Sequence, residues 1–153
     1  NDGLSPKQMD MTLDVMAHSL VYWTQDTVGA GLMGEGGRIF AMTSAGGHRI
    51  WKAYGAISAA KAALESHIRQ LAVELAVKGI TANSVQAGVT DTPALRKIPN
   101  SDEMIETVLR VNPHGRLTTP EMVADAIAAF AHPGTGWMTG NVIRVDGGED
   151  ITG

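Results

Sequence analysis

The residues best placed for chemistry are a phenol and an amine on one run, Tyr54-Gly-Ala-Ile-Ser-Ala-Ala-Lys61. On a helix, seven steps of about 100° bring the second side chain back to within roughly 20° of the first. We therefore expect Tyr54 and Lys61 to face one pocket from one helix and to act on one bound molecule. The phenol can give a proton, and the ammonium adds positive potential beside it.

Two other motifs imitate known sites. Gly29-Ala-Gly31-Leu-Met-Gly34 matches the dinucleotide pattern G-x-G-x-x-G, which works only where it follows a strand and opens a helix. Here the glycines close a predicted helix and precede a predicted strand, so we interpret them as a helix end and turn. Ser58-Ala-Ala-Lys61 has the S-x-x-K spacing of penicillin-recognising serine enzymes, but their S-D-N and K-T-G elements do not occur. A small helix residue is the favoured interpretation of Ser58.

Composition excludes several classes of function. The 153 residues are 44% hydrophobic and 18% charged, which suits a single domain over 1–153. A net charge of −4 argues against nucleic acid or an anionic membrane surface as the main partner, because both need clustered cations. No apolar stretch approaches the roughly 20 residues that cross a bilayer. The five histidines form no H-E-x-x-H motif, so we expect no metal, and the lack of cysteine favours a cytoplasmic setting.

Turn residues and periodicity predict alternating helices and strands. A long helix begins at the capping box Ser5-Pro6-Lys7-Gln8 and must stop within the glycine cluster 29–37. Strands separated by helices need crossover connections, which predicts an α/β fold with a parallel sheet covered on both faces. The other predicted helices are 54–78, capped by Gly79, 101–111 and 120–131, and the predicted strands are 38–43, 80–85 and 141–145, with an irregular segment at 87–100.

Further motifs accompany the Tyr54–Lys61 run in a fixed order. They are Ser44 before it, the segments 82–92 and 112–116 after it, and Asp146-Gly147-Gly148 near the end. The whole series resembles the C-terminal part of a short-chain dehydrogenase/reductase and spans nearly the whole chain. The resemblance implies an α/β fold that is the C-terminal part of a doubly wound, parallel-sheet Rossmann fold, with the first strands and the glycine-rich turn absent.

The spacing of tyrosine and lysine distinguishes subfamilies. Most members carry Tyr-x-x-x-Lys, but the residue four before Lys61 is Ile57, which has no proton to give. A six-residue gap resembles enoyl-acyl-carrier-protein reductases, and the loops bring it closest to the NADPH-dependent type III enzymes. An enoyl reductase delivers hydride to the β-carbon, so its acid must stand further from the hydride. Moving the tyrosine three residues earlier shifts its backbone by roughly 4.5 Å along the helix, the scale that conjugate reduction needs.

The resemblance implies a role for each site residue. Tyr54 would hydrogen-bond the thioester carbonyl and stabilise the enolate, and Ser44 would orient that carbonyl. Lys61 would hold the ribose hydroxyls of the cofactor, implied to be NADPH with NADH as the alternative. The structural alternatives are a packed tyrosine, a solvated lysine and hydroxyls that only hold turns. The remaining cofactor contacts would come from Gly88, Thr90 and Thr92.

The implied substrate is an enoyl group on acyl carrier protein, in fatty acid biosynthesis. Carrier proteins are acidic, so cations at the pocket rim would help to dock them, with solvated loop charges as the equal alternative. The implied enzyme is a homo-oligomer, dimer or tetramer, because two helices carry apolar residues beyond one stripe. Another ketone or alcohol oxidoreductase of the superfamily and a non-catalytic fragment stay open. The candidate rim cations are Arg49, Lys52, Arg96 and Lys97.

The first half of such a fold has no counterpart in the sequence. The family binds its cofactor mainly through a glycine-rich turn after its first strand, and nothing here supplies that strand or turn. The chain also begins at Asn1 without a methionine, so we expect it to be part of a longer product. Strand 38–43 would then present an unpaired apolar edge, and we expect another segment or subunit to cover it.

Overall fold

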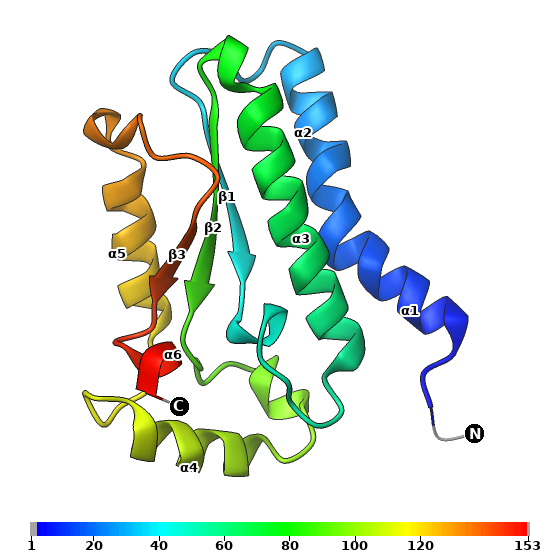
Figure 1. Cartoon of the computed structure of the whole chain (residues 1–153), viewed down its shortest axis with the longest axis vertical. Coiled ribbons are helices and arrows are strands. Elements are labelled where there is room, and N and C mark those ends of the chain that lie inside the picture. The colour runs from blue at the N-terminus through cyan, green and yellow to red at the C-terminus, as the bar shows by residue number, and fades with distance from the viewer. Residues whose placement is uncertain (1–2, 153) are drawn as a thin grey trace.

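The computed structural model describes residues 3–152 and contains a three-stranded parallel sheet between helices (Figure 1). Its strands are β1 (Arg38–Thr43), β2 (Thr81–Ala87) and β3 (Val142–Val145), in the order β1-β2-β3. The predicted α/β fold with a parallel sheet is confirmed. Within residues 3–152, no helix has the length and apolar character needed to span a bilayer. The helices are α1 (Pro6–Leu13), α2 (Ser19–Gly29), α3 (Gly55–Glu74), α4 (Ser101–Val111), α5 (Pro120–Phe130) and α6 (Glu149–Thr152).

The first predicted helix consists of three consecutive segments, α1, a π-helical turn and α2, which together are called the α1–α2 rod. It begins with the predicted capping box, in which Ser5 Oγ accepts from the Gln8 N–H and the Gln8 side chain accepts from the Ser5 N–H. A π-helical turn at Asp14–His18 joins α1 to α2 and packs against α3, where Ala17 is fully buried. The rod ends at Gly29, so the G-x-G-x-x-G glycines close a helix and lead into β1.

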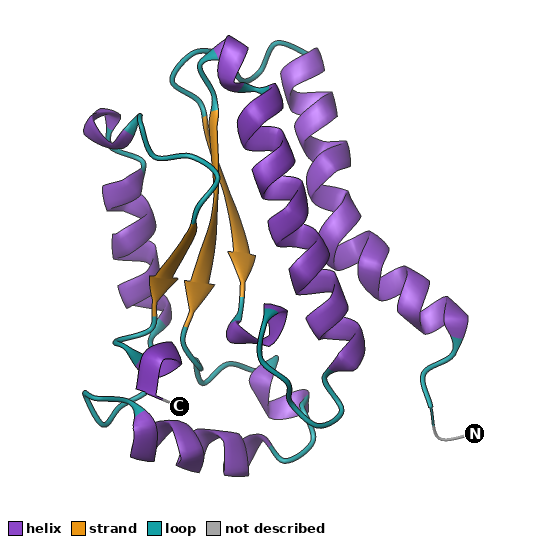
Figure 2. Ribbon diagram, viewed as in Figure 1, coloured by secondary structure: helices purple, strands orange, loops and turns teal. Residues whose placement is uncertain are grey.

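The main core lies between α3 and the sheet, with the α1–α2 rod beside α3 and α5 on the other side of the sheet (Figure 2). Alternate residues of the strands face α3, and the parallel register pairs Ile39 with Ala82. Complete burial of an aliphatic side chain contributes about 1.5–3 kcal/mol, so this contact fixes α3 firmly to the sheet. The buried stripe of α3 consists of Ala60, Leu64, Ile68, Leu71 and Ala72.

Element ends differ from the prediction by a few residues. The α-helical part of the third helix stops at Glu74, and a 3-10 turn over Ala76–Lys78 leads to Gly79, which ends it with a φ of 68° as predicted. β2 continues to Ala87, two residues beyond the predicted end, because it also pairs with β3. The short α6 was not predicted, since four residues carry no helical period.

β1 is an edge strand within residues 3–152. The Thr81 N–H donates to the Gly37 carbonyl, so the odd-numbered residues of β1 turn their backbone groups toward β2. Arg38, Phe40 and Met42 turn theirs outward, and no other strand of the described chain pairs with that side. The predicted edge is confirmed, and its cover by another segment or subunit stays a prediction.

Candidate active site

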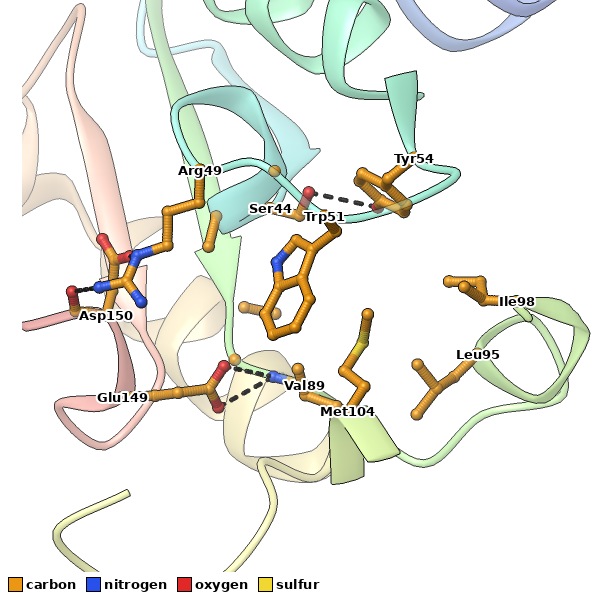
Figure 3. A pocket seen from close by; sticks show the side chains of 14 residues that line it. Ser44, Arg49, Trp51, Tyr54, Val89, Leu95, Ile98, Met104, Glu149 and Asp150 are labelled. Carbon is orange, nitrogen blue, oxygen red and sulfur yellow. Dashed lines mark hydrogen bonds and ion pairs between the residues drawn. The ribbon is translucent and has the colours of Figure 1, made fainter. Parts of the chain in front are cut away.

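A pocket of about 140 Å³ opens at the carboxyl ends of β1 and β2 (Figure 3). Ligands of open α/β sheets bind at this edge. The walls come from the loop between β1 and α3, the loop after β2, α4 and α6. Apolar side chains predominate, with a few polar groups among them, as in small-molecule sites. The lining residues are Ser44, Ala45, Gly46, Arg49, Trp51, Tyr54, Ala87, Gly88, Val89, Leu95, Ile98, Met104, Glu149 and Asp150.

Tyr54 and Ser44 meet in this pocket. Tyr54 is the residue before α3, with φ −103° and ψ 6°, and its hydroxyl lies 3.5 Å from the Ser44 hydroxyl. The phenol ring packs against the backbone of Gly46, because a Cβ at Gly46 would overlap the ring. Glycine at this position therefore leaves room for the ring. Two adjacent hydroxyls in an apolar pocket can hold one carbonyl oxygen between them.

Lys61 is not among the residues that line the pocket. Its Nζ donates to the Met42 carbonyl, at 2.8 Å, on the outward side of β1. Burial lowers the pKa of Lys61, and the nearby Glu65 carboxylate raises it to a smaller extent. Tyr54 is the N-cap residue of α3 and not a residue inside it, so a pocket shared by both side chains stays a prediction. The Lys61 amine lies at the neighbouring end of β1.

The predicted cofactor residues lie on the loop that follows β2. Gly88 lines the pocket, and the Thr90 hydroxyl donates to the Gly88 carbonyl at 2.9 Å. The Thr92 hydroxyl accepts from the Leu95 N–H at 3.2 Å. Thr118 holds the same loop, since its N–H donates to the carbonyl of residue 89. Both predicted threonines therefore support the loop backbone, and their contacts with a cofactor stay predictions.

Gly88 lies where three segments meet, which gives a testable consequence for stability. A Cβ at Gly88 would overlap Thr118 Oγ1 and would lie 2.9 Å from Glu149 Oε2 and 3.1 Å from the Asp146 Cα. Gly88→Ala is expected to lower the free energy of unfolding by about 1–3 kcal/mol, because overpacking forces the backbone to shift. Chemical denaturation measures the change. Gly55→Ala is the control, since its Cβ meets nothing within 4 Å. Equal midpoints for the two variants would contradict the close packing.

Asp150 is a buried acid that the sequence did not point to. Its carboxylate meets three basic side chains: Arg49 at 2.6 Å, Arg144 at 2.9 Å and His48 at 3.0 Å. Burial pulls the pKa of Asp150 upward, but the Gln86 amide, His48 and Arg49 outweigh burial and hold the pKa below its usual value. The group is therefore an anion that fixes α6 to the loop after β1.

Glu149 is a second acid that the sequence did not point to, and it lines the pocket. It accepts a hydrogen bond from the Val89 N–H, at 3.1 Å. Burial raises the pKa of Glu149, the Val89 N–H lowers it and the Asp146 carboxylate raises it again, with a net upward shift. The available signal was two acids directly after Asp146-Gly147-Gly148. The turn interpretation of that triplet is correct, with both glycines at positive φ, but a turn alone does not say where the next side chains point.

Two of the four predicted rim cations are already paired. Arg49 forms the ion pair with Asp150 described above, and Arg96 is held by two aspartates at 2.7 and 2.8 Å. Neighbouring carboxylates offset the charge of these arginines, and a part for them in docking a carrier protein stays a prediction. Lys52 and Lys97 have no ion-pair partner within the part of the chain that the structure describes.

The other chemical groups singled out in the sequence have structural contacts. Ser58 lies inside α3 and donates to the Gly46 carbonyl, so it supports the loop under Tyr54. His18 and His67 contact each other across the π-helical turn and α3, with 3.0 Å between Nδ1 and Nε2. Between residues 3 and 152, no group of three or more His, Cys, Asp or Glu side chains is placed to hold a metal ion.

Known proteins share this architecture. A model of the Enoyl-(Acyl carrier protein) reductase family matches residues 2–149. The 1-cyclohexenylcarbonyl-CoA reductase of Streptomyces collinus is 36% identical over 150 residues, which are 97% of this chain and 53% of that protein. The crystal structure of enoyl-[acyl-carrier-protein] reductase (NADH) from Aquifex aeolicus superposes with a TM-score of 0.91 at 31% identity, covering 98% of this chain and 58% of that one.

A further solved structure, which contains a different cofactor, is equally similar in fold. The enoyl-acyl carrier protein reductase of Bacillus cereus, in complex with NADP+ and indole naphthyridinone, has a TM-score of 0.91 at 30% identity, covering 97% of this chain and 57% of that one. The chain spans about half the length of the curated relatives it matches. The motif series, the parallel sheet and these matches together show that the chain belongs to the enoyl-(acyl carrier protein) reductase family of short-chain dehydrogenases/reductases.

Proposed function

We propose that the chain carries the substrate-activating residues of a reductase that saturates the carbon–carbon double bond of an enoyl thioester, with acyl carrier protein as the carrier, in fatty acid biosynthesis. The observation that carries the proposal is the pair of hydroxyls of Tyr54 and Ser44, 3.5 Å apart in a pocket at the carboxyl ends of the strands. Family membership supports the same chemistry.

Tyr54 and Ser44 act on the thioester carbonyl. The Tyr54 hydroxyl donates a hydrogen bond to the carbonyl oxygen and stabilises the negative charge that develops there, as an oxyanion hole does. Ser44 orients the same oxygen. The nicotinamide cofactor supplies a hydride to the β-carbon when it is bound. Ile57 stands where a ketone reductase of this superfamily has its tyrosine, which favours reduction of a double bond over reduction of a ketone.

The chain's own groups fit a nicotinamide nucleotide. The Lys61 ammonium has three N–H donors and, among residues 3–152, one hydrogen-bond partner, the Met42 carbonyl, so donors remain for ribose hydroxyls. Gly88, Thr90 and Thr92 lie on the loop beside the pocket and would contact the carboxamide and phosphates. NADPH is the proposed cofactor and NADH the alternative, since relatives are named for NADH and solved with NADP+.

The proposed assembly is a cytoplasmic homo-oligomer, dimer or tetramer. The α1–α2 rod and the end of α3 expose large apolar side chains that a second subunit would cover. Lys52 and Lys97 are the rim cations proposed to attract an acidic carrier protein, because the two arginines are paired. The exposed apolar residues of these helices are Met11, Val15, Tyr22, Trp23, Val73 and Val77.

Oxidation of NADPH by two thioesters tests the proposal. Crotonyl thioester, which has a double bond and no ketone, is expected to be reduced. Acetoacetyl thioester, which has a ketone and no double bond, is not. The reverse preference would identify a ketone reductase. If neither is reduced and the cofactor's fluorescence does not change on titration with the chain, the chain alone is not the enzyme.

A further inference from the structure

Two cavities share one wall between the loop before α3 and α4. The inner cavity, of about 140 Å³, holds the Tyr54 and Ser44 hydroxyls, and the outer cavity has a volume of about 170 Å³. Trp51, Ile98 and Met104 line both cavities. Figure 3 shows the Trp51 indole standing across the pocket, between Ser44 and Met104. These three side chains separate the reacting groups from the outer cavity.

The position of Trp51 relative to Tyr54 is set by the backbone. The Tyr54 N–H donates to the Trp51 carbonyl at 3.2 Å, which closes a turn over 51–54. Within the turn, Ala53 has a φ of 63°, in the left-handed region that alanine rarely adopts. Strained residues of this kind persist where the surroundings hold them in place, often beside functional sites. The turn therefore fixes the backbone of Trp51 relative to that of Tyr54.

The volume of the inner cavity limits what it can hold. A buried apolar cavity of about 150 Å³ is large enough for benzene. Sites that enclose drug-sized ligands measure roughly 300–1,000 Å³. With its thioester carbonyl at Tyr54, an acyl group in the inner cavity thus has space for about six carbons. A longer chain that continues toward the outer cavity meets Trp51, Ile98 and Met104.

We propose that Trp51 is a size-determining residue, whose indole bounds the inner cavity toward the outer one and restricts the reductase to enoyl thioesters with acyl groups of about six carbons or fewer. The inference rests on the proposed function, because that function places the thioester carbonyl at Tyr54. Without the indole, the inner cavity joins the outer one, where Ile98, Pro99 and Met104 provide apolar surface for a longer chain.

Trp51→Ala tests the wall through binding, without turnover. The full chain is titrated with butanoyl, hexanoyl, octanoyl and decanoyl pantetheine by isothermal calorimetry. For the wild type, affinity is expected to stop rising after hexanoyl. For Trp51→Ala, it is expected to rise by roughly fourfold for each added methylene, because each methylene gains a buried apolar site. Trp51→Phe keeps an aromatic ring and is expected to move the limit in the same direction by less.

Trp137→Ala is the matched control, since Trp137 is 99% exposed and lines neither cavity. The proposed role of Trp51 is rejected if the wild-type affinity rises through decanoyl. It is also rejected if both Trp51 variants leave the chain-length limit unchanged. A shifted limit together with reduction of acetoacetyl but not crotonyl thioester rejects the enoyl reductase function and keeps the wall. If enoyl thioesters are reduced but acyl binding shows no chain-length limit, the reductase function is kept and the role of Trp51 is rejected. Absence of acyl binding in every protein rejects both.

Discussion

Tyr54→Phe is expected to lower kcat/KM for an enoyl thioester by about 100- to 1,000-fold, because it removes a hydrogen bond aimed at the oxygen where negative charge develops. The dissociation constant of a saturated acyl thioester is expected to change little, since the phenyl ring keeps its packing against Gly46. An interaction made mainly in the transition state affects kcat more than binding. Steady-state kinetics and calorimetry measure the two effects separately.

Tyr22→Phe provides the matched control for this substitution. Tyr22 lies on α2 with half of its surface exposed, far in sequence from the pocket loops, and it does not line the pocket. Its loss of a hydroxyl is expected to leave both constants at wild-type values. If Tyr54→Phe also keeps the full rate, the phenol takes no part in the chemistry and Tyr54 is a packed structural residue.

The placement of Lys61 changes how the pair is understood. The amine donates to the outward carbonyl of Met42, on the edge strand, whereas Tyr54 lines the pocket. In the proposed function, the two groups serve different parts of a bound complex. The phenol is proposed to act on the acyl group, and the amine is proposed to bind the ribose of the cofactor. The resemblance to the family already implied these two roles, and the Lys61 contact with the Met42 carbonyl is compatible with them.

Where local signals agree, the sequence predicts the fold closely. β1 at 38–43 and α4 at 101–111 have the predicted ends, because turn residues border an apolar strand and an amphipathic helix. The π-helical turn at Asp14–His18 was not predictable in this way. It leaves the pattern of apolar residues nearly unchanged and is defined by packing of Ala17 on α3, which no local pattern encodes.

The same rule applies to the site: contacts within one loop could be predicted from the sequence, and contacts between distant segments could not. Ser44 and Tyr54 are ten residues apart and belong to one loop, so local sequence and family spacing brought them together. His48 and Asp150 lie 102 positions apart, and their contact exists only because β3 returns the chain to the carboxyl end of β2. The two acids of α6 therefore stayed outside the predicted site, although Glu149 lines the pocket.

Asp150→Asn is expected to lower the free energy of unfolding by about 1.5–3 kcal/mol, because the buried carboxylate makes charge-assisted hydrogen bonds that a neutral amide cannot replace. The substitution removes the one carboxylate that pairs with Arg49, Arg144 and His48. Denaturant unfolding measures the difference. Asp102→Asn is the control, since Asp102 is 85% exposed in its pair with Arg96, and exposed pairs contribute about 0–1 kcal/mol.

The dependence on pH identifies the charge of Asp150 as the cause. Its pKa in the fold lies below the unfolded value, so the carboxylate adds stability above about pH 4, and this stability is lost as the pH falls through the folded pKa. The difference between wild type and Asp150→Asn should therefore be largest near neutral pH and shrink in acid. A difference that stays constant would assign the loss to the shape of the side chain. Because α6 carries Glu149 into the pocket, the same variant should also weaken acyl thioester binding at neutral pH, which links this ion pair to the site.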